Sequence, residues 1–255
     1  MPSRREFLQS SATLASLATG VVPMAGETAL AADGAIASRS TRLSEWRFHL
    51  GHAADLDRDF GYGRNQRTFA KAGYETADAS RADFDDRGWR KVRVPHDWAV
   101  ELPFAPPAQA APKESADAVA AHGFKAIGRD HPENSIGWYR TALGITPADR
   151  ERSLWLEFDG VFRNSIIFVN GYVVATNDSG YAPFTVPIGD FLDYEGGPNV
   201  VTVRVDATLG EGWFYEGAGI YRHVDLVRTA PVHVAAHGSF VSSSIGPDGA
   251  NVSAT

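Results

Sequence analysis

Short runs in which apolar residues occupy every second position follow one another along most of the chain. Residues 153–160, SLWLEFDG, place Leu154, Leu156 and Phe158 in this way, which is the period of a β-strand with one buried face. Residues 199–207, NVVTVRVDA, repeat the pattern with valines. In residues 165–176, SIIFVNGYVVAT, two apolar runs are joined by Asn-Gly, a dipeptide that favours a two-residue hairpin turn.

Further strands are predicted in residues 89–95, 137–145 and 223–236, the last interrupted at Pro231. No segment after residue 35 keeps a 3.6-residue apolar period for three turns. Many short strands at this spacing are typical of an all-β sandwich.

Two regions depart from the strand pattern. Residues 101–122 are rich in Ala and Pro, and such a composition predicts an extended surface loop. The tail from about residue 237 has few bulky apolar residues. We expect it to open a second β domain without supplying a core for it.

Composition narrows the class of protein. The 255 residues are 44% hydrophobic and 22% charged, which is enough apolar material for a real core. The net charge of −7 leaves no basic footprint for nucleic acid. The chain contains no Cys, so disulfides, thiolate zinc sites and thiol catalysis are excluded.

The N-terminus has the features of an export signal. Arg4 and Arg5 precede a mildly apolar stretch, residues 10–22, and residues 29–31 read Ala-Leu-Ala. A paired arginine, a short apolar run and a small-x-small cleavage site in this order predict a twin-arginine signal peptide over residues 1–31. The alternative, a frayed amphipathic helix with a chance arginine pair, does not explain the order of the three features.

The apolar run is too short to anchor the protein in a bilayer. We therefore expect export to the periplasm or beyond, no stable membrane anchor, and a mature chain that begins near Ala32 with a linker over residues 32–41.

Several motifs fail as metal or catalytic sites. Residues 55–61, DLDRDFG, space three aspartates as a calcium loop does, but Phe60 stands where that loop needs Gly and Gln66 where it needs Glu. We interpret this segment as a solvated acidic turn. His49 and His52 have no further ligands at metal spacing. With no G-x-S-x-G motif and no phosphate-binding glycine loop, no metal and no cofactor are predicted.

Residues 212–226, GWFYEGAGIYRHVDL, combine the aromatic run Trp213, Phe214 and Tyr215 with three glycines. Aromatic rings supply large apolar area, and glycines allow the backbone to turn sharply around them. The combination predicts a shaped loop with a function, followed by a strand in which Arg222 and Asp225 belong to a structural ion pair.

Four segments carry a family resemblance when they are taken in order: VPHDWAVELPF (94–104), PENSIGWYR (132–140), FDGVFRNSIIFVNGYVV (158–174) and GWFYEGAGIYRHVDL (212–226). With them, residues 42–234 resemble the N-terminal sugar-binding domain of family 2 glycoside hydrolases of the β-galactosidase type. The resemblance implies a jelly-roll, galactose-binding-like β-sandwich. It also implies that residues 235–255 start a truncated immunoglobulin-like domain, and that a catalytic barrel follows.

The resemblance places the chemistry outside this chain. Retaining glycosidases need two carboxyl groups about 5–5.5 Å apart, and in this family both are glutamates of a barrel of about 250 residues. The family's acid/base glutamate follows an asparagine, and this chain has no Asn-Glu pair. No catalytic residue is therefore assigned, and the chain alone is expected to be inactive.

By the same resemblance, three residues border a sugar pocket that another domain completes: Asn134, Asp206 and Trp213. For Asn134 a turn role after Pro132 stays open, and for Asp206 a role as a strand-end turn carboxylate. The Pro-His-Asp-Trp segment (95–98) is expected to be architectural.

Two classes of function stay open. One is the accessory module of a β-galactosidase-like hydrolase, which would act on a β-galactoside, glucuronide or mannoside. The other is a free-standing carbohydrate-binding protein. The aromatic residues at 213–215 predict self-association into a homo-oligomer when the chain is isolated.

Overall fold

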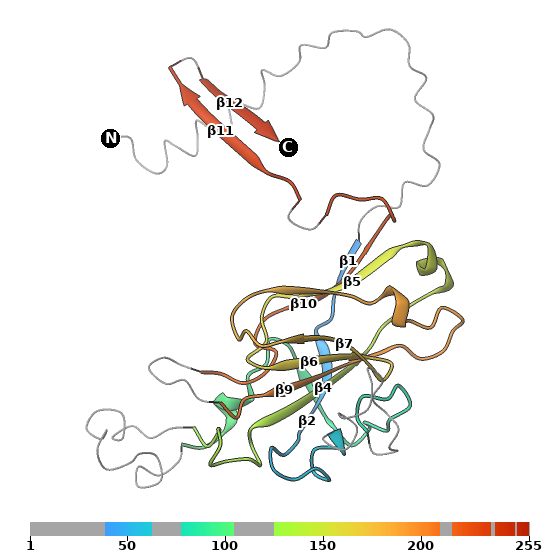
Figure 1. Cartoon of the computed structure of the whole chain (residues 1–255), viewed down its shortest axis with the longest axis vertical. Coiled ribbons are helices and arrows are strands. Elements are labelled where there is room, and N and C mark those ends of the chain that lie inside the picture. The colour runs from blue at the N-terminus through green and yellow to red at the C-terminus, as the bar shows by residue number, and fades with distance from the viewer. Residues whose placement is uncertain are drawn as a thin grey trace, which may run out of the picture. The chain divides into compact units, whose positions relative to one another are not determined.

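The computed structural model describes residues 39–62, 78–104, 125–209, 216–235, 238–247 and 249–254. These residues form β-strands joined by loops and short 3₁₀ helices (Figure 1), which confirms the all-β prediction. The 3₁₀ helices are η2 (Trp98–Glu101), η3 (Pro147–Glu151) and η4 (Gly189–Phe191). Among the described residues, no helix has the length and apolarity needed to cross a membrane.

Ten strands form two antiparallel sheets. The four-stranded sheet has the order β1 (Arg39–Arg42), β10 (Val224–Thr229), β5 (Ser153–Phe158), β8 (Phe184–Pro187). The six-stranded sheet has the order β3 (Arg90–Arg93), β2 (Glu45–Leu50), β4 (Ile136–Ala142), β9 (Val200–Asp206), β6 (Ser165–Val169), β7 (Tyr172–Asn177).

The predicted hairpin turn is confirmed. Asn170 and Gly171 join β6 to β7 with φ angles of 51° and 84°, the left-handed region that Asn and Gly tolerate best. The strand expected over residues 223–236 is shorter than predicted, because β10 ends at Thr229 before Pro231. Most of the loop expected over residues 101–122 lies outside the described residues.

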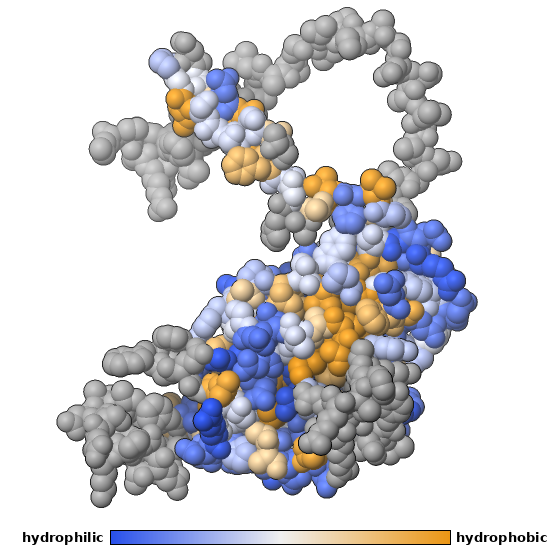
Figure 2. All heavy atoms as spheres, viewed as in Figure 1, coloured by the Kyte–Doolittle hydropathy of each residue, from blue (hydrophilic) through white to orange (hydrophobic). Residues whose placement is uncertain are grey.

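The two sheets share one hydrophobic core. The six-stranded sheet contributes Tyr139, Ile167, Val201, Val203 and Val205, and the four-stranded sheet contributes Leu154, Leu156, Phe158, Val224 and Leu226. Along each strand these are the alternate residues that the sequence pattern placed on the buried face. Polar side chains cover much of the visible surface of the sandwich, interrupted by a band of apolar residues (Figure 2).

The opposite face of the six-stranded sheet is also covered, which alternation did not predict. Trp138 and Phe168 project from that face and pack with Trp89, Phe60 and Phe84 of the connecting segments. Consequently β4 and β9 are buried along most of their length on both faces.

A separate two-stranded hairpin is formed by β11 (Val241–Gly246) and β12 (Gly249–Ala254), and every residue of both strands is exposed.

Candidate functional site

Two of the three predicted sugar contacts meet at one end of the six-stranded sheet. Asp206, the last residue of β9, is the register partner of Ile136 in β4, and Asn134 lies two residues before Ile136. The junction continues past the strands, where Ala207 N donates to Ser135 O at 2.9 Å. Trp213 lies outside the described residues.

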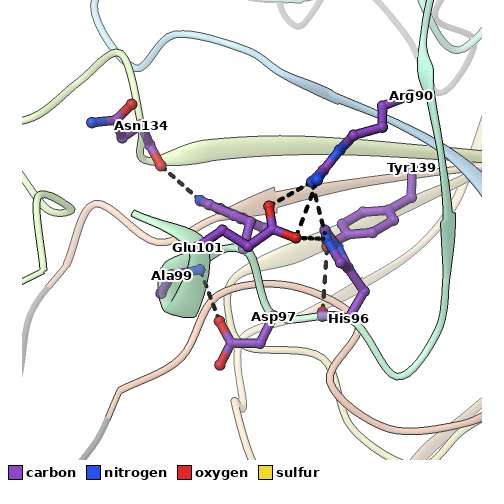
Figure 3. A network of polar contacts seen from close by, with 8 residues as sticks. Arg90, His96, Asp97, Ala99, Glu101, Asn134 and Tyr139 are labelled. Atoms are coloured by element: carbon purple, nitrogen blue, oxygen red, sulfur yellow. Dashed lines mark hydrogen bonds and ion pairs between the residues drawn. The ribbon is translucent and has the colours of Figure 1, made fainter. Parts of the chain in front are cut away.

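The turn role that the sequence left open for Asn134 is present. Its backbone N donates to His131 O at 3.0 Å, and its side-chain Nδ2 donates to Ala126 O at 2.9 Å. Its backbone O accepts a hydrogen bond from Trp98 Nε1 at 2.8 Å (Figure 3). Within the described part of the chain, no hydrogen bond to Asn134 Oδ1 is found, and the residue is partly buried.

The turn role of Asp206 is present as well. Its Oδ1 accepts from Thr208 N at 3.0 Å and from Thr208 Oγ1 at 2.6 Å. Its Oδ2 faces Arg204 NH1 at 3.5 Å, and 29% of the side chain is exposed. Asp206 also lines a cavity of about 450 Å³ together with Asp178. The carboxylate is therefore held in one orientation while part of it faces solvent.

Arg204 forms a buried ion pair with Asp59. Asp59 Oδ2 accepts from Arg204 Nε at 3.0 Å and from NH2 at 2.8 Å, and Asp59 Oδ1 accepts from Trp138 Nε1 at 2.7 Å. The Tyr62 ring lies 4.4 Å from the Arg204 guanidinium carbon. Burial raises the pKa of the Asp59 carboxyl, although Arg204 and Trp138 oppose this shift.

This pair corrects the interpretation of residues 55–61 as a solvated turn. Asp55 behaves as expected, because its Oδ1 caps the backbone N of Asp57 and Arg58. Asp59, however, is only 3% exposed. The prediction was wrong for Asp59 because its partner stands 145 positions later in the chain. The signal was available in β9, where Arg204 interrupts a run of valines.

No metal centre is found in the part of the chain that the structure describes, since no three His, Asp or Glu side chains gather there in a suitable cluster.

The Pro-His-Asp-Trp segment fastens the start of η2 to the glycine-rich loop. Asp97 Oδ1 accepts from Ala99 N at 2.9 Å (Figure 3). The same oxygen accepts from Ala218 N at 2.9 Å. The backbones also pair, because His96 N donates to Ile220 O at 2.8 Å and Trp98 N to Ala218 O at 2.9 Å. PHDW and GAGIYR, two of the segments that carried the resemblance, are thus parts of one structural unit.

A polar network closes the same unit (Figure 3). His96 Nδ1 lies 2.7 Å from Tyr139 Oη, and His96 Nε2 lies 3.2 Å from Glu101 Oε1. Arg90 NH2 lies 2.6 Å from Glu101 Oε2. Burial lowers the pKa of His96, opposed by Glu101, and burial raises the pKa of Tyr139 well above its ordinary value.

Tyr139, His96 and Glu101 are in hydrogen-bonding contact one after another, an arrangement that can transfer a proton. Tyr139 is completely buried, however, so no substrate reaches its hydroxyl. The row therefore holds η2 in place, in agreement with the architectural role expected for this segment.

The ion pair expected for Arg222 and Asp225 has a different composition. Asp225 Oδ1 accepts from Arg42 Nε at 2.7 Å, its register partner in β1. Arg222 precedes β10, and its NH1 donates to Asp159 O at 3.3 Å. The expectation was wrong because cross-strand register, rather than sequence spacing, decides which residues face each other in a sheet.

The protein is a two-sheet β-sandwich in which PHDW and GAGIYR pack against each other, and Asn134 and Asp206 lie at one end of its six-stranded sheet. No protein-family model matches the chain. Among curated proteins, it is 32% identical over 207 residues to the β-galactosidase BoGH2A of Bacteroides ovatus, covering 81% of this chain and 20% of that protein. It is 29% identical over 170 residues to a putative β-glucuronidase of Formosa agariphila, covering 66% of this chain and 15% of that protein.

Solved structures of related fold also belong to glycoside hydrolases. A family 2 glycosyl hydrolase of Bacteroides cellulosilyticus superposes with a TM-score of 0.57 at 27% identity, over 81% of this chain and 23% of that one. A β-glycosidase of Bacteroides vulgatus shares the fold with a TM-score of 0.58 at 22% identity, over 85% of this chain and 24% of that one.

The chain is therefore homologous to the N-terminal part of family 2 glycoside hydrolases of the β-galactosidase and β-glucuronidase types. It spans 20% of the first of these curated relatives and 15% of the second.

Proposed function

We propose that residues 42–234 are the non-catalytic, galactose-binding-like jelly-roll domain of an exported β-galactosidase-type hydrolase. In this role the domain contributes Asn134 and Asp206, together with Trp213, to the rim of a sugar pocket that a catalytic barrel completes. The domain itself carries no cofactor and no turnover. One observation carries the proposal: the β4–β9 junction brings both polar residues to the same sheet end in a chain homologous to these hydrolases.

The geometry of Asp206 suits recognition of sugar hydroxyls. An ionised carboxylate makes stronger hydrogen bonds than a neutral acceptor. Thr208 fixes Oδ1, and Arg204 lies beside Oδ2 without covering the side chain. A carboxylate that is already oriented loses little freedom when it binds a ligand.

A chimera gives the direct test. Residues 39–234, which include the whole of β1, would replace the N-terminal domain of the Bacteroides ovatus β-galactosidase, and Asp206→Asn would be introduced. Asparagine keeps an Oδ1 acceptor for Thr208 but removes the charge. We expect kcat/KM for a β-galactoside to fall roughly 10- to 150-fold, the equivalent of about 1.5–3 kcal/mol for a charged hydrogen bond.

The matched control is Asp178→Ala, an exposed carboxylate that lines the same cavity. We expect it to leave kcat/KM unchanged. Unchanged kinetics in Asp206→Asn, or loss of folding in that variant, would leave Asp206 with its turn role alone.

The alternative of a free-standing binding protein finds no support, because the relatives matched are larger hydrolases. A partner domain is favoured by the β11–β12 hairpin. One of its faces carries Val241, Ile245 and Val252, with 62%, 87% and 68% exposed, and the other carries mostly Ser, Gly and Asn. We propose that residues 235–255 begin a second, immunoglobulin-like β domain that covers this apolar face.

We also propose export by the twin-arginine route, on the basis of Arg4 and Arg5, which lie outside the described residues. Replacing both with lysine is expected to retain the precursor in the cytoplasm, because the route reads the arginine pair. Cell fractionation and immunoblotting measure this. A variant found outside the cytoplasm at the parental level would refute the assignment.

A further inference from the structure

The outer face of the six-stranded sheet carries a row of three cations on three neighbouring strands. Arg47 of β2 lies directly opposite Lys91 of β3 on one side and opposite Arg140 of β4 on the other. Like charges in directly opposite positions destabilise a sheet. The row is therefore unfavourable for folding unless negative charge meets it.

Within the part of the chain that the structure describes, one member of this row has an ion-pair partner. Arg140 is buried, and its Nε lies 3.0 Å from Asp86 Oδ2. Arg47 NH1 donates to the uncharged carbonyl of Trp89 at 3.2 Å. Among the described residues, no hydrogen bond or ion pair reaches the Lys91 ammonium. The other acidic residues described in the segment before β3 are engaged elsewhere: Asp83 by Arg81, Asp85 by Arg87, and Asp78 by the backbone N of Ser80.

These cations line a cavity of about 440 Å³, which is within the size range of small-molecule sites. Lys91 and Arg93 are exposed at its edge, and Glu45 stands opposite Arg93 in the β2–β3 register. None of the residues that line this cavity lines the cavity beside Asp206. The cavity thus offers several cations next to two carboxylates, Glu45 and Asp86, of which Asp86 is paired with Arg140.

We propose that this cavity is a second saccharide site, which binds a uronic acid residue of an acidic glycan. The sugar carboxylate lies among Arg47, Lys91 and Arg93, because guanidinium and ammonium groups form charge-assisted hydrogen bonds with carboxylate oxygens. Ring hydroxyls donate to Glu45. The hydrogen phosphate dianion has a single hydroxyl donor for Glu45, and its higher charge is repelled more strongly by that carboxylate.

Isothermal titration of the full chain with trigalacturonate tests the proposal. The double variant Lys91→Gln/Arg93→Gln removes two exposed charges and leaves the buried Arg140–Asp86 pair intact. We expect its dissociation constant to rise at least about tenfold. Raising the ionic strength is expected to weaken parental binding, because salt screens exposed charges.

Arg129→Gln is the matched control, since Arg129 is exposed on the loop that precedes β4, away from the cavity. We expect it to bind as the parent does. Thermal unfolding without ligand separates binding from folding. Removing Lys91 relieves its repulsion by Arg47, whereas removing Arg93 takes away the residue opposite Glu45, so the double variant is expected to melt close to the parent. Trigalacturonate is expected to raise the melting temperature of the parent only.

Neutral galactotriose and inorganic phosphate complete the probes. Parental binding of trigalacturonate with no detectable affinity for galactotriose, lost in the double variant, supports a uronate site. Equal affinity for galactotriose, tighter binding of phosphate, or undiminished binding by the double variant would each overturn it. No heat of binding for trigalacturonate would overturn it as well. The kinetics of an Asp206 chimera do not bear on these outcomes.

Discussion

Replacing Asp59 with alanine is expected to lower the free energy of unfolding by about 3–5 kcal/mol, the usual result of removing one partner from a buried ion pair. Arg204 is 7% exposed, and two of its three guanidinium nitrogens donate to Asp59 Oδ2. The variant also leaves the buried Trp138 Nε1 without its acceptor. Urea denaturation of the full chain, followed by tryptophan fluorescence, measures the change.

Asp57→Ala is the control from the same turn. Asp57 is exposed, and we expect its removal to change stability by less than about 1 kcal/mol. Asp59→Asn should fall between the two, because an amide oxygen still accepts from Trp138 but no longer neutralises Arg204. A loss below about 1 kcal/mol in Asp59→Ala would show that the buried pair does not stabilise the fold.

Gly219→Ala is expected to lower the free energy of unfolding by at least about 2 kcal/mol, because a backbone penalty and a steric penalty add. The residue has a φ of +124°, which side-chain-bearing residues rarely adopt. A methyl group built there would also overlap Tyr139 Oη and His96 O, the groups that hold η2 in place. Thermal and urea unfolding of the full chain check the expected loss.

Gly196→Ala separates the two penalties. Gly196 has a φ of +99°, and a methyl group there meets nothing within 4 Å. The decrease in the free energy of unfolding of Gly196→Ala reports the backbone penalty alone. We expect the decrease in Gly219→Ala to be clearly larger. Equal losses in the two variants would mean that the close approach of the glycine loop to Tyr139 and His96 contributes little.

From the sequence alone, the strands, the turn at Asn170-Gly171 and the family resemblance all follow, because each depends on local patterns. The alternation of apolar and polar residues predicts which side chains share a face of a strand, and Asn-Gly predicts where the chain reverses direction. The order and spacing of four short segments, PHDW and GAGIYR among them, were enough for the family resemblance. An architectural role was predicted for PHDW alone, and the structure adds its partner, because Gly217 and Gly219 permit the close contacts with Asp97 and Tyr139.

Only the tertiary structure decides what covers the second face of a strand and which residues oppose each other across a sheet. Alternation marks Arg140, Thr202 and Arg204 as facing away from the core, and the sequence alone would leave them in solvent. The connecting segments bury all three, so Asp59 becomes the partner of Arg204. The strand register likewise places Asp225 opposite Arg42. It also places Lys91, Arg47 and Arg140 side by side on three neighbouring strands. These pairings join residues far apart in the chain, and their energies depend on burial and distance, which no local pattern contains.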